Sequence, residues 1–441
     1  MKIGFIAMAA VIVVLVSSCG TAEHINVVLI LTDTVRADHL SCYGYERSTS
    51  PHIDSLAAAG TLFKNCQGQA SWTLPCMATI MSGVAPVVHG AGRNSSDLHG
   101  ISTEVPWLPL AFHREGYRTA AFFNVIFMNE DFNFHRGFQH FDCRGVSSGN
   151  SLRKAGPTVD DFMEWLDTGD ANKPFFAAVH FYDPHIPYNA PEPYRSLYIN
   201  PDYSGYYGDL WGSVPEMMEV NSGEVVPSEA DLQNLIALYD GEISYMDSEI
   251  GKLLAGLRVR GFSENTIVLI VGDHGEEFFD HGGIEHGRNL YQETTHVPLI
   301  AAGPGFNSGG VVTQRVAQLD IAGTLAEAVG IEFTVCEPSQ NLLEEMNAAR
   351  DIPASGVLWY QQGDLVSIVS DNSKIIWSVE DDSVESFNLA TDPLEREILE
   401  PEENLVRAAE YYWATPPVGE APLVNCSETA ARELRNLGYI R

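Results

Sequence analysis

The sequence has 441 residues, 45% of them apolar, and its 25 basic and 59 acidic residues give a formal net charge of −34. This negative charge argues against binding to nucleic acid or to an anionic membrane surface, because both are themselves negatively charged. The length suits one large α/β domain with an appendage, or two domains, with apolar content enough for a sizeable core.

The N-terminal segment predicts export. One lysine precedes an apolar run that ends at Val16, which is short for a transmembrane span and typical of a secretory signal. An uncleaved anchor helix is the alternative. The run ends in Val16-Ser17-Ser18-Cys19, which resembles a bacterial lipobox. The resemblance implies a signal peptide over 1–18, acylation of Cys19, and an exported lipoprotein on the periplasmic or cell-surface face of a membrane.

Five short apolar runs predict buried parallel strands. They cover residues 25–31, 118–123, 174–181, 266–271 and 297–302. Helical stretches lie between them, and the clearest runs from about Ser228, a plausible cap, to Arg260, with Gly261 ending it. The alternation of strands and helices predicts an α/β fold with an open, doubly wound and mostly parallel sheet.

Three parts of the chain differ in composition from the rest. Residues 194–227, rich in Tyr, Gly, Pro and Asp, predict a surface insertion and a candidate lid. After residue 345, short alternating segments with turns between them predict a small antiparallel sheet, and 427–440 predicts a closing helix. We therefore expect one α/β domain over 19–345 and a C-terminal α+β subdomain over 346–441.

Polar side chains follow three of the predicted strands at their carboxyl ends. Asp33 follows the first strand, Asp183 and His185 follow the third, and Asp273 and His274 follow the fourth. This edge of an open α/β sheet is where ligands bind, although a single Asp there can also serve as a turn or capping residue. The two carboxylates of Asp33 and Asp273, with the imidazole of His274, suit a divalent metal ion.

A loop before a predicted helix over 77–81 contains two candidate nucleophiles. The stretch 70–83 reads ASWTLPCMATIMSG and offers Thr73 and Cys76. A hydroxyl at Thr73 would lie near the positive end of the helix, where an anionic ester is favoured. The structural alternative is that Thr73 only caps the helix.

Several segments together resemble the sulfatase family, within the alkaline phosphatase superfamily. They are NVVLILTDTVRADHLSCYGY, SWTLPCMATIMSG, DPHIPYNAP, GDHGEEFFDHGG…HGRNLYQETTHVPLI, FNLATDPLEREIL and LRNLGYI. The resemblance covers nearly all of the mature chain. It implies an alkaline-phosphatase-like sandwich with a small C-terminal antiparallel subdomain, and a metal-dependent hydrolase of anionic esters.

The resemblance places Thr73 at the family's nucleophile position, where a Cys or Ser is usually oxidised to formylglycine. Threonine is not a known substrate for that oxidation, and the Arg expected four residues on is Met77, so we expect an unmodified hydroxyl. Other branches of the superfamily use such a hydroxyl, held by a metal, mainly to attack phosphorus. The resemblance implies that Thr73 joins Asp33, Asp273 and His274 as a metal ligand.

Two further departures from the family bear on the metal. Thr34 stands where a second Asp is usual, and His286 where Lys is frequent. Fewer carboxylates and more imidazoles favour zinc or manganese, although calcium, which prefers six to eight oxygen ligands, stays possible. In a two-metal site, Asp183, His185 and His286 would hold the second ion. With one metal, the two histidines would bind the ester oxygens or protonate the leaving group.

Four other residues are given roles. Asn94, after the helix that follows Thr73, and Arg36 are candidate substrate contacts, although a surface role suits Arg36 equally. Cys76 is interpreted as a small buried residue. The expected partners are a small-molecule or glycan anionic ester and, through the lipid on Cys19, a membrane.

Two interpretations of the function stay open. The hydroxyl at position 73 favours a phosphate or phosphonate ester, whereas family membership alone implies a sulfate ester. The other is a catalytically retired protein that binds sulfated or phosphorylated glycans or lipids. The departures at Met77 and Thr34 support retirement, and the retained metal ligands oppose it.

The lipobox can be tested by one substitution. Cys19→Ser removes the acylated residue, so we expect the variant to move from the membrane to the soluble fraction, measured by cell fractionation after a salt wash. Retention of the variant on the washed membrane would show that the lipid anchor is wrongly assigned.

Overall fold

The computed structural model describes residues 24–93, 98–144, 153–170, 172–205, 214–335, 339–345, 354–358 and 364–424. The predicted signal peptide with Cys19, Asn94, and the predicted closing helix over 427–440 lie outside these residues. In the described part of the chain, no helix is both long enough and apolar enough to cross a bilayer.

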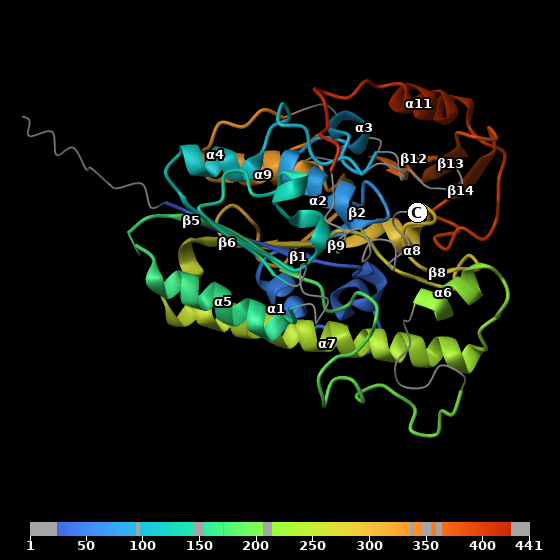
Figure 1. The fold of residues 1–441 in the computed structure, drawn as a ribbon, viewed down its shortest axis with the longest axis horizontal. Helices are drawn as coiled ribbons and strands as arrows, with labels where there is room; N and C mark the ends of the chain where they lie inside the picture. Colours follow the sequence, from blue (N-terminus) through green and yellow to red (C-terminus); the bar gives the residue numbers. More distant parts are fainter. Residues whose placement is uncertain are drawn as a thin grey trace, which may run out of the picture.

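An eight-stranded sheet forms the centre of the molecule (Figure 1). In spatial order its strands are β10 (Gly310–Ala317), β2 (Thr61–Gln67), β9 (His296–Ala302), β6 (Thr266–Gly272), β1 (Asn26–Thr32), β5 (Phe175–Phe181), β3 (Arg118–Phe123) and β4 (His140–Cys143). The predicted strands are each found within one residue of their expected ends. The mostly parallel sheet that the sequence predicts is confirmed.

One strand runs against the prediction. β9 is antiparallel to both β2 and β6, whereas the remaining pairs of the sheet are parallel. The expectation of a parallel strand at 297–302 is therefore wrong. A strand that is buried on both faces consists of apolar residues whether it runs parallel or antiparallel to its neighbours. Its composition therefore does not reveal its direction.

Three strands of the central sheet were not expected from the sequence. β2 includes Lys64 and Asn65, which interrupt its apolar pattern, and β10 is an edge strand with partly exposed residues. β4 is only four residues long. Each lacks the continuous apolar run by which central strands are recognised.

Helices cover both faces of the sheet (Figure 1). On one face lie α2 (Thr73–Ser82), α4 (Leu108–Arg114), α9 (Asp320–Ala328) and α10 (Leu342–Glu345), which share one apolar core. On the other lie α1 (Pro51–Ala59), α5 (Ala155–Thr168) and α7 (Glu229–Val259), with a second core. The shorter elements are α3 (Pro86–His89), α6 (Val214–Asn221), α8 (Gln292–Thr295) and the hairpin of β7 (Glu277–Phe278) with β8 (Ile284–Glu285).

The longest predicted helix is confirmed together with its ends. α7 has 31 residues, and the Ser228 side chain accepts a hydrogen bond from the Asp231 N–H while the Asp231 carboxylate accepts one from the Ser228 N–H. This reciprocal cap satisfies two backbone donors at the start of the helix. Gly261, with φ 77°, follows its end.

The C-terminal part forms a second, antiparallel sheet. Its strands, in order, are β11 (Ala354–Leu358), β12 (Leu365–Ser370), β13 (Ser373–Ser378) and β14 (Val384–Asn388). α11 (Glu403–Trp413) covers this sheet by burying Leu405 and Ala409. The sandwich with a small antiparallel C-terminal sheet, as the sequence predicts, is confirmed.

A buried ion pair stabilises this second sheet and ties it to the first. Lys374 Nζ lies 2.7 Å from Glu395 Oε1, and both side chains are fully buried. The other carboxylate oxygen of Glu395 accepts a hydrogen bond of 2.6 Å from the N–H of Gln292, the first residue of α8. The pair therefore joins β13 to the segment that leads into β9.

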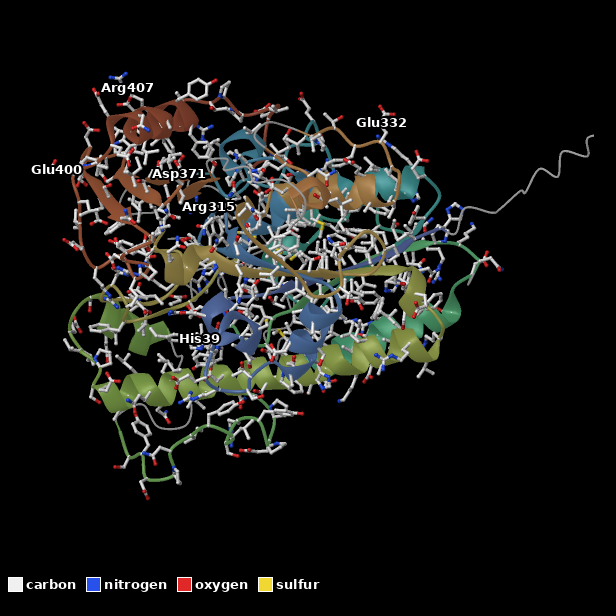
Figure 2. The ribbon with its side chains drawn as sticks, turned by 180° about the vertical axis from the view of Figure 1, so that it is seen from behind. His39, Arg315, Glu332, Asp371, Glu400 and Arg407 are labelled. Atoms are coloured by element: carbon white, nitrogen blue, oxygen red, sulfur yellow. The ribbon has the colours of Figure 1, made fainter. Side chains whose placement is uncertain are left out.

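Lys374→Met should lower the free energy of unfolding by about 3–5 kcal/mol, because it leaves the Glu395 carboxylate buried without its counter-charge. Urea unfolding measures the change. Arg407→Ala is the control: Arg407 lies at the outer surface (Figure 2), in a 2.9 Å pair with the exposed Glu403. Its loss should change stability by at most about 0.5 kcal/mol. Equal effects of the two substitutions would contradict the role of the buried pair.

Candidate active site

Two carboxylates meet because two neighbouring strands end side by side. β1 pairs with β6 in parallel, with Thr32 opposite Gly272, so Asp33 and Asp273 follow at matching positions. Backbone bonds continue past the strand ends, from Asp33 N to Phe181 O at 2.9 Å and from Asp273 N to Thr32 O at 3.1 Å. Side chains alternate between the faces of a strand, so both carboxylates project to the face that α2 covers.

Asp33, Asp273 and His274 form a compact group of potential metal ligands. Their ligand atoms all lie within 4.8 Å of one another. His274 Nε2 is 3.4 Å from Asp273 Oδ2 and 3.6 Å from Asp33 Oδ1, and all three side chains are fully buried. The structure thus brings together the three residues that the sequence suggested as ligands.

The tautomer of His274 is fixed by its neighbour. Its Nδ1 lies 2.9 Å from the Gly275 carbonyl oxygen, which can only accept, so Nδ1 carries the hydrogen. Burial and then the neighbouring His286 lower the pKa of His274 well below its usual value, so the ring is neutral. Nε2 therefore presents a lone pair to the carboxylates, which is the form in which imidazole binds a metal.

The donor set fits a divalent cation. Burial, and then the charge of Glu276, raise the pKa of Asp33 well above its usual value, and burial and the charge of Asp33 do the same to the pKa of Asp273. Among the residues that the structure describes, no donor makes a hydrogen bond of good geometry to either oxygen of Asp33 or to Oδ2 of Asp273. Buried carboxylates are normally paired or bound to a metal, and oxygen and imidazole donors together suit ions such as zinc or manganese.

Thr73 lies against this group. α2 begins at Thr73, earlier than expected, and Trp72 is the N-cap residue, so Thr73 does not cap the helix. Its Oγ1 is 3.4 Å from His274 Nε2, and the residue is 1% exposed. The hydroxyl is therefore held at the helix N-terminus, next to the candidate metal ligands.

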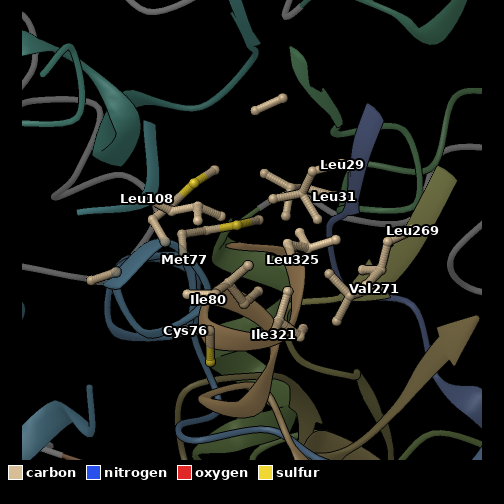
Figure 3. Packing of buried hydrophobic residues seen from close by; sticks show 14 of the residues in the cluster. Leu29, Leu31, Cys76, Met77, Ile80, Leu108, Leu269, Val271, Ile321 and Leu325 are labelled. Atoms are coloured by element: carbon tan, nitrogen blue, oxygen red, sulfur yellow. The ribbon is translucent and has the colours of Figure 1, made fainter. Parts of the chain in front are cut away.

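Cys76 and Met77 point into the core instead. The Cys76 thiol donates a 3.2 Å hydrogen bond to the Ala70 carbonyl, and burial raises its pKa well above the usual value. Met77 is fully buried in the apolar cluster between α2 and the sheet, which includes Leu29 and Leu31 (Figure 3). Cys76 is small and buried, as the sequence suggested, but it belongs to the helix rather than to a loop.

Two further imidazoles stand beside His274. The ring of His286 is 4.3 Å from that of His274 and 4.9 Å from that of His185, measured between centroids. Burial lowers the pKa of His286 to about 3 and, together with the nearby His286, lowers that of His185 well below its usual value. The structure therefore brings both predicted histidines to the site in neutral form.

His185 and His286 have different hydrogen-bond partners at Nδ1, and these partners set how each ring can handle a proton. His185 Nδ1 lies 2.7 Å from the Ile186 carbonyl and 2.8 Å from the Tyr182 hydroxyl, so it carries the hydrogen and Nε2 is an acceptor. His286 Nδ1 instead lies 3.0 Å from a carboxylate oxygen of Glu276. A carboxylate on Nδ1 stabilises the imidazolium that forms when Nε2 takes up a proton, so His286 is the better suited of the two rings to take up a proton and pass it on.

Two predicted site residues have other partners. Asp183 Oδ1 accepts a 3.1 Å hydrogen bond from the N–H of Ala155, the first residue of α5, and Asp183 is not in the Asp33 group. Arg36 is 6% exposed, and its guanidinium binds Asp38 and Asp280 at 2.8 Å each. The positive charge of Arg36 is therefore neutralised by these two carboxylates.

The predicted insertion over 194–227 contains α6, and the C-terminal end of this helix contacts the segment that carries His286. Asn221, the last residue of α6, accepts a 2.9 Å hydrogen bond from the Ile284 N–H and donates one of 3.2 Å to the Ile284 carbonyl. Ile284 begins β8, which leads directly to His286. α6 therefore supports the loop that carries His286.

Sequence reasoning missed the roles of two residues around the candidate ligands. Glu276 contacts His286 and accepts a 3.1 Å hydrogen bond from the Tyr188 hydroxyl. The one feature of the sequence that indicated a role for Glu276 in the site was its position two residues after His274. Thr34 has φ 55°, an uncommon conformation for a β-branched residue. Its N–H donates a 3.1 Å hydrogen bond to Asp273 Oδ1, so this strained residue fixes a ligand.

Comparisons with known proteins find relatives along most of the chain. A family model described as Sulfatase matches residues 25–331. An arylsulfatase of Clostridium perfringens is 24% identical over 451 residues, covering 88% of this chain and 91% of its own.

Solved structures share the fold. A phosphonate monoester hydrolase of Agrobacterium radiobacter has a TM-score of 0.66 at 19% identity, covering 88% of this chain and 94% of its own. A protein solved with its substrate, D-glucosamine-2-N,6-O-disulfate, has a TM-score of 0.70 at 19% identity, covering 94% and 98%.

Removal of a divalent metal should destabilise the protein, because the two carboxylates would again face each other without compensation. A metal present at about 100 times its Kd stabilises by about 2.7 kcal/mol, so a chelator should lower the Tm by several degrees in calorimetry. Asp273→Asn should abolish most of the metal content, measured by elemental mass spectrometry.

The matched control for this prediction is Asp247→Asn. Asp247 is also buried, but its carboxylate accepts hydrogen bonds from the backbone of His52 and Ile53, away from the site. The control should keep its metal. Equal metal content in the two variants would contradict the assignment of Asp273 as a ligand.

Proposed function

The chain belongs to the sulfatase family of ester hydrolases, and we propose that it is a metal-dependent enzyme whose unmodified Thr73 attacks an anionic ester. The observation that carries this proposal is the 3.4 Å contact between Thr73 Oγ1 and His274 Nε2. It sets the hydroxyl of Thr73 against a buried metal-ligand group.

The residues divide the chemistry among them. A divalent metal bound by Asp33, Asp273, His274 and Thr73 would supply the positive charge that lowers the pKa of the hydroxyl and neutralises an ester oxygen. Attack by Thr73 Oγ1 breaks the ester bond and transfers the acid group to Oγ1. The proton of the Thr73 hydroxyl passes through His286 to the leaving oxygen, and water then cleaves the new threonine ester and returns a hydrogen to Thr73 Oγ1.

The hydroxyl nucleophile favours a phosphate or phosphonate ester over a sulfate ester. A formylglycine hydrate keeps a second hydroxyl with which it can expel sulfate, whereas threonine has one oxygen and would remain as a stable alkyl sulfate. A threonine ester of phosphoric or phosphonic acid can be cleaved by water at the central atom. The fold similarity to a phosphonate monoester hydrolase is consistent with this choice.

We propose zinc or manganese as the metal, because His274 contributes nitrogen and Thr34 contributes no carboxylate. The substrate is a small-molecule or glycan ester, in keeping with the glucosamine disulfate bound by one similar structure. We further propose that the enzyme acts outside the cytoplasm, attached to a membrane through a lipid on Cys19.

Thr73→Ala should abolish turnover while leaving the fold and much of the metal in place, and Thr73→Ser should keep part of the activity because the hydroxyl survives. Both are assayed on aryl sulfates, phosphate monoesters, phosphodiesters and phosphonate esters, with zinc, manganese or calcium added. We expect the highest rates on a phosphorus ester with zinc or manganese. A slow phosphorus substrate should leave an adduct on Thr73 in intact-mass measurements.

Cys76→Ala is the control, and it should slow the reaction less than tenfold, or about 1.4 kcal/mol in the barrier. Loss of activity in Cys76→Ala with full activity in Thr73→Ala would overturn the nucleophile. A preference for aryl sulfates with calcium would overturn the substrate class and the metal. Binding of every ester without turnover would indicate the retired binding protein instead.

A further inference from the structure

We propose that His180 is a positioning residue of the metal site, whose Nε2–H faces the Asp33 carboxylate and so holds it for the metal. His180 lies near the end of β5, is fully buried, and places Nε2 3.4 Å from Asp33 Oδ2. The inference rests on the metal site of the proposed function, but not on Thr73 or on the substrate.

The sheet register directs the two side chains to each other. β5 pairs with β1 in parallel, with His180 opposite Leu31. Leu31 and, two residues on, Asp33 project to the face under α2, and so do Phe176 and His180 on β5. The neighbours of His180 on its own strand, Val179 and Phe181, belong to the core of the opposite face. The contact is therefore a consequence of strand pairing.

Asp33 supplies the polar contact of this imidazole. In the described part of the chain, neither ring nitrogen of His180 makes a hydrogen bond of good geometry. A buried polar group without a partner costs about 1–3 kcal/mol, so an apolar residue would suit this strand better if the ring had no task. An ionised carboxylate can only accept hydrogen bonds, and a neutral imidazole has a single N–H. The ring nitrogen that faces Asp33 is therefore the one that carries the hydrogen.

Hydrogen bonds from outside the strand restrain the end of β5 that carries His180. The Asn124 side chain donates a hydrogen bond to the His180 carbonyl oxygen, and its own oxygen accepts one of 2.7 Å from Arg153 Nε. Arg153 is in turn paired with Asp142 and Asp161 at 2.9 and 2.8 Å. This buried network restrains the backbone from which the imidazole reaches Asp33.

The contact separates the tasks of the two oxygens of Asp33. Oδ2 faces His180, while Oδ1 lies 3.6 Å from His274 Nε2, on the side of the other ligands. A carboxylate held in this way binds a metal through one oxygen in a defined direction. Loss of such an outer partner typically costs about 10–100-fold in metal affinity, and this is the effect that we expect for His180.

The test compares variants of the full-length, metal-free protein by zinc binding, measured in competition with a chelating dye. His180→Leu removes the donor and should weaken zinc binding about 10–100-fold. His180→Gln can keep an N–H at the same reach and should recover most of the affinity. Phe176→Leu is the control, since Phe176 lies on the same face of β5 and is equally buried; it should bind zinc like the wild type. Circular dichroism checks that each variant is folded.

Asp33→Asn separates this inference from the proposed function. If Asp33→Asn loses zinc and His180→Leu binds it as tightly as Phe176→Leu, the positioning role is overturned and the metal site stands. If Asp33→Asn keeps zinc, the metal site itself is wrong. Should His180→Leu fail to fold, His180→Phe provides a second donor-free side chain, for which the same loss is expected. Equal affinities of His180→Gln and the folded donor-free variant would also overturn the proposal.

Discussion

The site depends on one electrostatic constraint: Asp33 and Asp273 are buried side by side at the ends of two paired strands. Two such carboxylates repel each other and cannot both be ionised without compensation. The surrounding features are arranged to supply it. The backbone N–H groups of Thr34 and His274 both donate to Asp273 Oδ1, at 3.1 and 2.7 Å, and α2 begins at Thr73, beside His274. A divalent cation would complete this compensation.

The sequence predicted the parts of this arrangement that come from strand ends. Central strands are continuous apolar runs, and polar residues directly after them lie at one edge of a parallel sheet, so Asp33, Asp273 and His274 were recognisable before their contacts were known. His185 was recognisable in the same way and His286 from the family motifs, and the structure places the ring of His286 between those of His274 and His185.

The parts that could not be predicted depend on contacts between distant segments. The direction of β9 is set by its pairing with β2 and β6, which composition does not reveal. Asp183 has the same sequence context as a ligand, and only the position of α5 shows that it binds the Ala155 N–H. Asn94 and Cys19 lie outside the described residues, so their predicted roles stay predictions. Glu276 contacts His286, ten residues away, and Thr34 donates a hydrogen bond to Asp273, 239 residues away.

The burial of Met77 limits how the proposed nucleophile could be exchanged by engineering. Met77 fills apolar space between α2 and the sheet, next to Leu29 and Leu31 (Figure 3). An arginine there would place a charge among these side chains, which costs several kcal/mol unless a counter-charge is built at the same time. Under the proposed function, replacing Thr73 by a cysteine that is converted to formylglycine, with the arginine that this conversion usually needs at position 77, would therefore require further changes in the core. The packing around one methionine would make such an exchange of nucleophile depend on several substitutions at once.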